Sequence, residues 1–233
     1  MPVSEGKSPE KIRRMFSSVS GRYDFFNHLL SANLDRFWRR ALINELRIGR
    51  GSRVLDVCCG SGDVAIACAR RGAEVTGLDF TQAMLDKAAE KTSRGKIHVC
   101  WIWGDACALP FADCSFDAVS MAFGLRNIAR PVDALRECVR VLQPGGRLGI
   151  LELCPPQTGM IHGLYRRYLG VIPAAVRMFG GRCRAYRYLG ASIETFLSPD
   201  KVMEGLLQAR ALRAGRRVLF PGVAHLFWGE KGG

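Results

Sequence analysis

The chain has 233 residues, of which 48% are hydrophobic, and its 34 lysines and arginines outnumber its 21 acidic residues by 13. This length and apolar content fit one α/β domain with a proper core, and no apolar run is long enough to span a membrane. The positive charge indicates an anionic partner, a nucleic acid or an acidic membrane surface, although a basic bias of the whole proteome would also produce it.

The cysteines and the first 20 residues indicate in which cellular compartment the protein is found. Nine cysteines are scattered through the sequence without a Cys-x-x-Cys pair, so we expect no metal site. Residues 1–20 are polar and basic and lack the apolar core of a signal peptide. An odd number of cysteines in such a chain favours reduced thiols and a cytoplasmic location.

Residues 9–46 show a helical pattern rich in aromatic residues, and no strand signal accompanies them. A helical segment without a strand of its own has to pack over the sheet or over the site. We therefore expect an N-terminal helical arm, either covering an apolar substrate or simply packing on the domain.

The most informative stretch is residues 54–63, where an apolar run that contains Asp56 ends in the turn Gly60-Ser61-Gly62. A helical pattern follows the turn, so the segment predicts a strand, a tight loop and a helix. Glycines in such a loop let the backbone approach a ligand closely.

The next predicted strand, residues 74–79, ends in Asp79. Two parallel strands joined by a helix place Gly60, Gly62 and Asp79 at the carboxyl ends of the strands, where open α/β sheets bind ligands. The glycine spacing also fits the dinucleotide fingerprint, so the ligand class has to be decided by charge.

A pyrophosphate at a helix N-terminus favours amides and no anions, whereas Asp56 and Asp63 flank this loop. Two carboxylates suit a ligand with a cationic amine and a sulfonium, and Asp79 can accept hydrogen bonds from ribose hydroxyls. We therefore predict S-adenosylmethionine as the cofactor. The alternative is a structural turn with solvated acids and no ligand.

Two further strands are predicted to end at the same edge of the sheet. Strand 97–103 is followed by Asp105 and Ala106, where a carboxylate beside a small residue suits an adenine amine. Strand 116–122 is followed by Arg126 and Asn127. A charged pair directly after a sheet strand is costly unless something pairs with it, so we expect it to face the substrate, with a structural salt bridge as the alternative.

The rest of the chain completes the sheet. We expect a helix over 131–142, a tight turn over 143–146, a strand over 147–153, a helix over 199–212 and a hairpin formed by 217–220 and 223–228. Between them, residues 155–193 contain six arginines and no acidic residue, interleaved with aromatic and aliphatic positions. Such a basic amphipathic segment is typical of a membrane-surface element.

These elements predict a Rossmann-like α/β fold with a seven-stranded, mostly parallel sheet and an antiparallel last strand. The expected parts are an arm over 1–48, a cofactor-binding core over 49–154, a basic lid insertion over 155–195 and a C-terminal helix and hairpin over 196–233.

The sequence resembles the class I S-adenosylmethionine-dependent methyltransferases, and within them the ubiquinone/menaquinone biosynthesis C-methyltransferases. Four linked motifs account for this resemblance: Tyr23-Asp24-Phe25-Phe26-Asn27 with Ser31 and Trp38; Phe123-Gly124-Leu125-Arg126-Asn127; residues 140–147 followed by Glu152; and Tyr186-Arg187-Tyr188-Leu189. The similarity covers about residues 12–230. Departures from the family pattern are Phe26, Asp35, Ala122, Gln143 and Cys154.

The resemblance implies C-methylation of a polyprenylated quinol, a naphthoquinol or a benzoquinol. It also assigns Ser61 to the glycine loop, Asp79 to the ribose, and Asp105 with Ala106 to the adenine. For the chemistry, we expect Arg126 to stabilise the developing phenolate and Asn127 to orient the ring.

The general base is open: His28 and Asp24 on the arm are candidates, and Tyr23 either stacks on the quinol or packs. Because a prenylated substrate resides in a bilayer, we expect peripheral binding to the anionic inner face of the membrane. No RNA- or DNA-binding motif accompanies the arginines, so nucleic acid is not an expected partner.

Two other functions stay open. One is methylation of another lipid or small molecule, on oxygen instead of carbon. The other is a basic nucleic-acid-binding protein with a vestigial nucleotide fold. Whether the chain forms a homodimer is also left open.

Overall fold

The computed structural model describes residues 33–95, 97–154 and 196–233 and nine single residues outside these ranges. The single residues are Glu10, Arg13, Arg14, His28, Ser31, Gly159, Gly163, Arg167 and Gly170. Tyr23, Asp24 and most of the predicted lid insertion lie outside the described residues, so the predictions made for them stay predictions.

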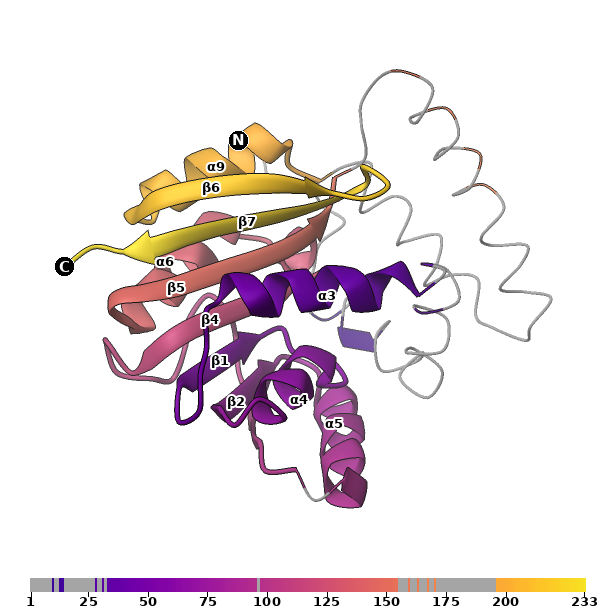
Figure 1. Ribbon diagram of the computed structural model, residues 1–233, viewed down its shortest axis with the longest axis vertical. Coiled ribbons are helices and arrows are strands. Elements are labelled where there is room, and N and C mark those ends of the chain that lie inside the picture. Colours follow the sequence, from indigo (N-terminus) through magenta and orange to yellow (C-terminus); the bar gives the residue numbers. More distant parts are fainter. Residues whose placement is uncertain are drawn as a thin grey trace.

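Seven strands form one sheet in the order β3-β2-β1-β4-β5-β7-β6 (Figure 1). Strands β1 to β5 run parallel, and β7 is antiparallel to both of its neighbours. The strands are β1 (Arg53–Val57), β2 (Glu74–Asp79), β3 (Cys100–Trp103), β4 (Phe116–Ala122), β5 (Leu142–Leu153), β6 (Ala211–Leu219) and β7 (Ala224–Lys231). This confirms the predicted fold class.

The helices of the described ranges cover both faces of the sheet (Figure 1). They are α3 (Leu34–Glu45), α4 (Asp63–Ala69), α5 (Gln82–Gly95), α6 (Pro131–Val141), α9 (Pro199–Gln208) and the short 3₁₀ helix η2 (Leu125–Asn127). Local chemistry fixes some of their starts. Proline occupies the first turn of α6 and α9, and the Ser198 side chain accepts a hydrogen bond from the Lys201 backbone N–H at the start of α9.

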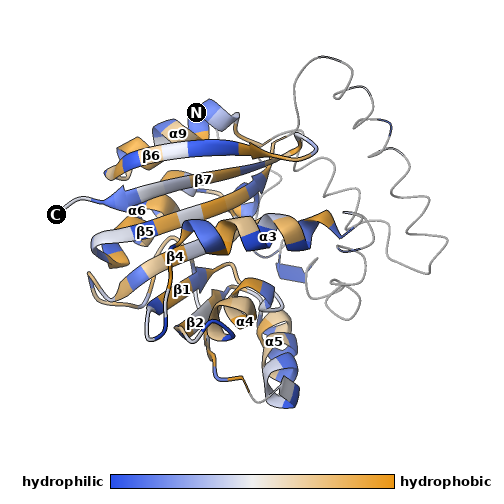
Figure 2. Ribbon diagram, viewed as in Figure 1, coloured by the Kyte–Doolittle hydropathy of each residue, from blue (hydrophilic) through white to orange (hydrophobic). Residues whose placement is uncertain are grey.

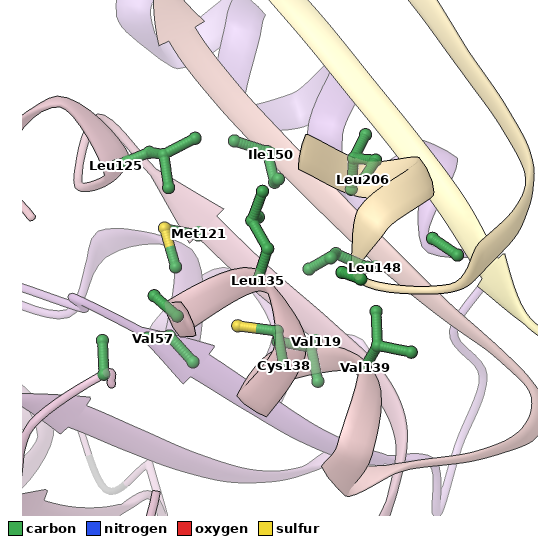
Figure 3. Packing of buried hydrophobic residues seen from close by; sticks show 14 of the residues in the cluster. Val57, Val119, Met121, Leu125, Leu135, Cys138, Val139, Leu148, Ile150 and Leu206 are labelled. Carbon is green, nitrogen blue, oxygen red and sulfur yellow. The ribbon is translucent and has the colours of Figure 1, made fainter. Parts of the chain in front are cut away.

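One core layer lies between the sheet and the helices α6 and α9 (Figure 3). Leu135 of α6 reaches toward Ile150 of β5, and Cys138 of α6, Leu206 of α9 and Met121 of β4 belong to the same cluster. All five side chains are buried, so this layer supplies a large part of the hydrophobic stabilisation.

The second core layer lies under α3 and α4 and contains Trp38, Leu42 and Val64. Successive residues of β1 face opposite layers, since Val54 belongs to this layer and Leu55 to the other. The outer positions of the helices are polar, most visibly in the C-terminal half of α5 (Figure 2). Both faces of the central strands are therefore buried, which explains their nearly continuous apolar sequence.

The bounds of several elements differ from the prediction. The helix expected to end near residue 91 continues to Gly95, because the intervening residues contain no helix breaker. The strand expected from residue 97 begins at Cys100, where pairing with β2 starts. The expected turn at 143–146 lies inside β5, between the pairs Phe116–Leu142 and Ala118–Arg147.

The C-terminal region differs most. The predicted helix over 199–212 ends at Gln208, and β6 begins at Ala211. The predicted strand started only at residue 217, because the arginines and Gly215 at the start of β6 hide its strand pattern. This strand lies at the edge of the sheet, where exposed arginines are tolerated.

Candidate active site

A cavity of about 210 Å³ opens at the carboxyl ends of the parallel strands. The loops that follow β1, β2, β3 and β4 form its walls. Five of the predicted site residues line it: Gly60, Asp79, Asp105, Ala106 and Asn127. These loops follow four different strands, so the sheet brings together residues that are distant in the sequence.

The glycine loop after β1 is held against the end of β2. The Gly60 backbone N–H donates to Asp79 Oδ2 at 2.8 Å, and Gly60 has a φ of +54° with open space where a Cβ would point. Gly62 has a φ of +84°, and a Cβ there would lie 2.5 Å from Trp101 Cη2. Gly60 therefore leaves room at the cavity, whereas Gly62 makes room for the Trp101 ring of β3.

Asp79 faces the cavity with a carboxylate that is already oriented. Its Oδ1 accepts from the Thr81 backbone N–H at 2.8 Å, and its Oδ2 accepts from Gly60. Burial raises the pKa of this carboxyl, and the two backbone donors counteract the rise. A fixed carboxylate at the end of the second strand is suited to accept hydrogen bonds from ribose hydroxyls.

Asp56 was predicted to contact the cofactor, but it does not line the cavity. It is only 1% exposed, its Oδ1 accepts from Ser120 Oγ at 2.7 Å and its Oδ2 accepts from the Ala65 backbone N–H at 3.1 Å. Burial raises the pKa of this carboxyl to about 7 in spite of these two donors. The geometry gives Asp56 a bracing role, since it ties β1 to β4 and to the first turn of α4.

The carboxylate of Asp63, which was predicted to attract a cationic ligand, is instead paired with two cationic side chains of the protein. Its Oδ2 lies 2.9 Å from Arg39 Nη1 and its Oδ1 lies 2.8 Å from Lys91 Nζ. Lys91 also donates to the hydroxyl of Ser61 at 3.0 Å, and Ser61 is 3% exposed. The acids that led to the prediction of a cationic ligand are thus satisfied within the protein, and the attraction for a cation falls chiefly to Asp79.

Asp105 and Ala106 form the wall after β3. Asp105 is exposed and Ala106 is buried, and Asp105 Oδ1 accepts from the Cys107 backbone N–H at 2.9 Å. An exposed carboxylate beside a small, buried residue leaves space for a flat heterocycle and an acceptor for its amine.

The loop after β4 contains a buried ion pair. Arg126 Nη1 donates to Glu152 Oε2 at 2.7 Å, and the Arg126 backbone N–H donates to Glu152 Oε1 at 3.1 Å. Arg126 is 5% exposed and does not line the cavity. The predicted alternative of a structural salt bridge describes this geometry, while Asn127 is the residue of the pair that reaches the cavity wall.

His28 contacts the first turn of α3. Its Nδ1 lies 2.8 Å from Asp35 Oδ2, and its side chain is 23% exposed. Asp35 also accepts from Ser31 Oγ at 2.7 Å, and burial is the largest influence on its pKa, although the hydrogen bonds and nearby cations lower the pKa overall. His28 does not line the cavity that the described residues form.

Sequence reasoning assigned no site role to several wall residues, namely Cys58, Phe80, Thr81 and Phe123. The available signal was position, because each lies within two residues of the end of a parallel strand. Burial raises the pKa of the Cys58 thiol far above its ordinary value, so this cysteine is a neutral wall residue and not a nucleophile. Within the part of the chain that the structure describes, no cluster of three metal-ligating side chains occurs.

Solved structures share this fold. A methyltransferase from Aquifex aeolicus superposes with a TM-score of 0.60 at 20% identity, covering 96% of this chain and 98% of that one. A phosphoethanolamine N-methyltransferase from Haemonchus contortus, solved with S-adenosyl-L-methionine, gives a TM-score of 0.63 at 16% identity over 84% of this chain and 52% of that one. These likenesses show the class of fold: a Rossmann-like α/β fold of the kind that class I methyltransferases have.

The particular family follows from the sequence comparisons. The model of the ubiE/COQ5 methyltransferase family matches residues 4–231, and the chain belongs to that family. A relative from Deinococcus radiodurans named demethylmenaquinone methyltransferase is 39% identical over 95% of this chain and 93% of its own length. One from Paracoccus denitrificans named ubiquinone/menaquinone biosynthesis C-methyltransferase UbiE is 38% identical over 98% and 94%.

Proposed function

We propose that the protein transfers a methyl group from S-adenosylmethionine to a ring carbon of a polyprenylated quinol. The observation that supports this most is a single cavity in which the glycine loop, Asp79 and Asp105 face the loop of Phe123 and Asn127. The names of the D. radiodurans and P. denitrificans relatives agree with a quinone-pathway substrate.

The residues present fit the cofactor. Gly60 leaves open space beside the loop, Asp79 presents a carboxylate fixed by two backbone N–H groups, and Ala106 supplies a small surface beside Asp105. Asp79 would hold the ribose hydroxyls and Asp105 the adenine amine. When bound, the cofactor supplies a methyl group that its sulfonium already activates.

The acceptor carbon has to become electron-rich, which requires the reduced ring with one hydroxyl losing its proton. The new carbon–carbon bond forms as the methyl–sulfur bond breaks, and the ring carbon then releases its hydrogen as a proton to restore aromaticity. The protein mainly aligns the reactants, and orientation of this kind contributes about 7–11 kcal/mol in well-aligned reactions.

Asn127 is the side chain of the Arg126–Asn127 pair that can orient the ring, because it lines the cavity. Arg126 lies behind the cavity wall, where its pairing with Glu152 fixes the 3₁₀ turn that contains Asn127. Its guanidinium carbon lies 5.8 Å from the centre of the Phe123 ring. Its positive charge beside this wall would stabilise a developing phenolate through space.

Asp24 and His28 stay our two candidates for the general base, with His28 acting through a water. Asp35 would orient its imidazole and stabilise the protonated form, as carboxylates do for catalytic histidines. Tyr23 and Asp24 keep their proposed roles at the acceptor, and both lie outside the described residues.

The test is incubation with methyl-labelled cofactor and a set of reduced acceptors. We expect a singly methylated ring carbon on a prenylated naphthoquinol or benzoquinol, seen by mass spectrometry and by loss of the aromatic proton in NMR. Label on oxygen, or label only on unrelated lipids, would replace this proposal with the alternative methyltransferase.

A non-enzymatic role in nucleic-acid binding is disfavoured by membership in a methyltransferase family. A filter-binding assay with and without cofactor checks it. Tight binding of nucleic acid that ignores the cofactor would restore that role.

We also propose that the protein works in the cytoplasm at an anionic membrane surface. Among the described residues, no helix is long and apolar enough to cross a membrane. The proposal rests on the acid-free, arginine-rich composition of 155–193 and on Phe220, which is 73% exposed and follows the exposed Arg216 and Arg217 of β6 by four and three positions. Flotation with anionic and neutral vesicles tests it, and equal binding to both at every salt concentration would contradict it.

A further inference from the structure

Arg39 of α3 does not line the cavity, but it contacts Phe123 of the cavity wall and Asp63, which directly follows the glycine loop. The Arg39 side chain is only 16% exposed, and its Nη1 lies 2.9 Å from Asp63 Oδ2. Its Nε lies 3.5 Å from Asp35 Oδ2, and its guanidinium carbon lies 5.6 Å from the centre of the Phe123 ring. The proposed mechanism gives this arginine no task, although it joins Asp35 of its own helix, Asp63 beside the glycine loop and the Phe123 ring of the cavity wall.

The contact with Asp63 leads to the cofactor side. Asp63 is the first residue of α4 and directly follows Gly62, so it moves with the glycine loop. Lys91 joins the same carboxylate at 2.8 Å to the Ser61 hydroxyl at 3.0 Å. A shift of the loop on cofactor binding would therefore change the position of the partner of Arg39.

The contact with Phe123 leads to the acceptor side. Phe123 lines the cavity, and its φ of +58° is unusual for a bulky residue without a left-handed preference. The centre of its ring lies 5.6 Å from the guanidinium carbon of Arg39, 5.8 Å from that of Arg126 and 6.4 Å from the centre of the Trp38 ring. Such a backbone conformation persists only where the surrounding structure over-determines it. Here the Phe123 backbone N–H donates to the Leu151 carbonyl at 2.7 Å, and the three side chains surround the ring.

The third contact leads to the arm. Asp35 is 3% exposed and joins Arg39 to His28, whose Nδ1 lies 2.8 Å away. A continuous series of polar contacts thus runs from His28 through Asp35, Arg39 and Asp63 to the cofactor loop.

We propose that Arg39 is a positioning residue that couples the binding of the methyl donor to the binding of the acceptor. When the donor settles the glycine loop, Asp63 holds the guanidinium in place, and the guanidinium in turn holds the Phe123 ring as a wall for the acceptor. Coupling of this kind is reciprocal, so each ligand should raise the affinity for the other by the same factor. This inference rests on the proposed function, because it needs both ligands in one site.

The test is a thermodynamic cycle with two probes, S-adenosylhomocysteine and a short-chain 2-prenyl-1,4-naphthoquinol kept reduced under argon. Calorimetry gives the Kd of each probe alone and in the presence of the other. For the wild-type protein we expect each probe to strengthen the other about 5- to 50-fold, within the usual range of coupling between sites.

Arg39→Met keeps an unbranched apolar stem and removes the charged guanidinium. We expect this variant to bind each probe alone within about fivefold of wild type, while the coupling falls below about threefold. In turnover assays at saturating donor, the KM for the acceptor should rise more than kcat falls. A role limited to folding would lower kcat through a smaller active fraction and leave the coupling and both KM values unchanged.

Two further variants separate the contact of Arg39 with Asp63 from its contact with the Phe123 ring. Arg39→Lys keeps a cation for Asp63 but loses the planar group that packs on the Phe123 ring, and Phe123→Leu removes the ring. Both should reduce the coupling while affinity for S-adenosylhomocysteine alone stays near wild type. Arg36→Met, at an exposed arginine of the same helix, is the matched control and should keep the full coupling.

The possible outcomes distinguish a failure of the role proposed for Arg39 from a failure of the proposed methyl transfer. Wild-type protein that methylates the quinol but shows no coupling, or Arg39→Met with wild-type coupling, overturns the role of Arg39 and leaves the function standing. Wild-type protein that binds neither probe overturns both. If Arg39→Met does not fold, as judged by thermal unfolding, Arg39→Lys decides in its place.

Discussion

The two sides of the cavity are built by different means. On the proposed donor side, formed by the loops after β1, β2 and β3, backbone groups fix the key carboxylate: Gly60 and Thr81 donate to Asp79. On the proposed acceptor side, formed by the loop after β4, a buried ion pair behind the cavity wall holds the loop in place, since Arg126 pairs with Glu152 of β5.

The difference matches what each side would bind. A cofactor of constant shape is served by backbone geometry, which changes little when side chains are substituted. A ring whose charge develops during the reaction needs fixed charges close by, and these are expensive to bury. Substitutions should therefore be tolerated on the donor side wherever the backbone is unchanged, and should damage stability and turnover together on the acceptor side.

The largest expected effect is on the acceptor side. Glu152 is completely buried, and Glu152→Gln removes the negative charge beside Arg126 while keeping the shape. Breaking a buried ion pair by removing one partner's charge usually costs about 3–5 kcal/mol. Urea unfolding should show a loss of this order, and turnover should fall with it.

The matched control is the exposed pair of Arg94 and Glu90 on α5, whose side chains are 77% and 58% exposed. Glu90→Gln should change the free energy of unfolding by less than about 1 kcal/mol. Similar losses for the two glutamine variants would show that the acceptor side does not depend on its buried charges.

A pH experiment comes next and probes Asp56, which lies behind the donor side. Burial raises the pKa of this carboxyl from 3.8 to about 7, so between these values the folded state holds a proton that the unfolded chain has lost. The contribution of Asp56 to stability therefore falls as pH rises through this window. A shift of about three pKa units corresponds to at most about 4 kcal/mol.

Asp56→Asn cannot titrate, so its stability relative to wild type should increase from pH 4 to pH 7 and then level off. Ser120→Ala removes one hydrogen bond to Asp56 but leaves the carboxyl, so it should retain a wild-type pH slope. Parallel stability curves for wild type and Asp56→Asn would show that Asp56 is ionised throughout and that the brace is a charged one.

The fold could be predicted where the hydrophobic pattern of the sequence matched only one kind of element. The apolar run of β1, the glycine turn and the following helical pattern gave the first βαβ unit almost to the residue, because both faces of these strands are buried. The start of β6 could not be predicted, because this edge strand is largely exposed and lacks the apolar run of a buried strand. Its exposed arginines resemble the polar face of a helix.

Single residues of the site were harder to predict than the position of the site. The ends of parallel strands identified Asp79, Asp105 and Asn127 as cavity residues. The partners of Asp63 could not be predicted, because Arg39 and Lys91 are 24 and 28 positions away and meet it only through packing of α3 and α5. The pairing of Arg126 with Glu152 is equally non-local.

Two glycines test the donor side at intermediate cost. Gly62→Ala places a Cβ 2.5 Å from Trp101 Cη2 at a φ of +84°, and we expect a loss of about 1–3 kcal/mol in the free energy of unfolding. Gly60→Ala meets no atom within 4 Å, so only its φ of +54° is penalised, by about 1 kcal/mol.

Affinity for S-adenosylhomocysteine should show the reverse order. The added methyl of Gly60→Ala projects into open space beside the cavity, where it would displace the cofactor, so its Kd should rise at least about tenfold. Gly62→Ala should bind nearly normally wherever it is folded. A Gly60→Ala protein with wild-type affinity would place the cofactor away from this loop.

The smallest expected effect comes from Trp103, a donor-side side chain that is 52% exposed. Its indole N–H donates to the Phe80 carbonyl at 2.9 Å, and its ring lies 5.6 Å from that of Phe80, which lines the cavity next to Asp79. Trp103→Phe removes the hydrogen bond and keeps the ring contact, so we expect a loss of about 0.5–1 kcal/mol in stability and less than a threefold change in Kd. Trp103→Ala removes both contacts, yet Asp79 keeps its two backbone donors, so its Kd should still change less than that of Gly60→Ala. If Trp103→Ala weakened binding as much as Gly60→Ala, the donor side would depend on its side chains after all, and the contrast between the two sides of the cavity would be lost.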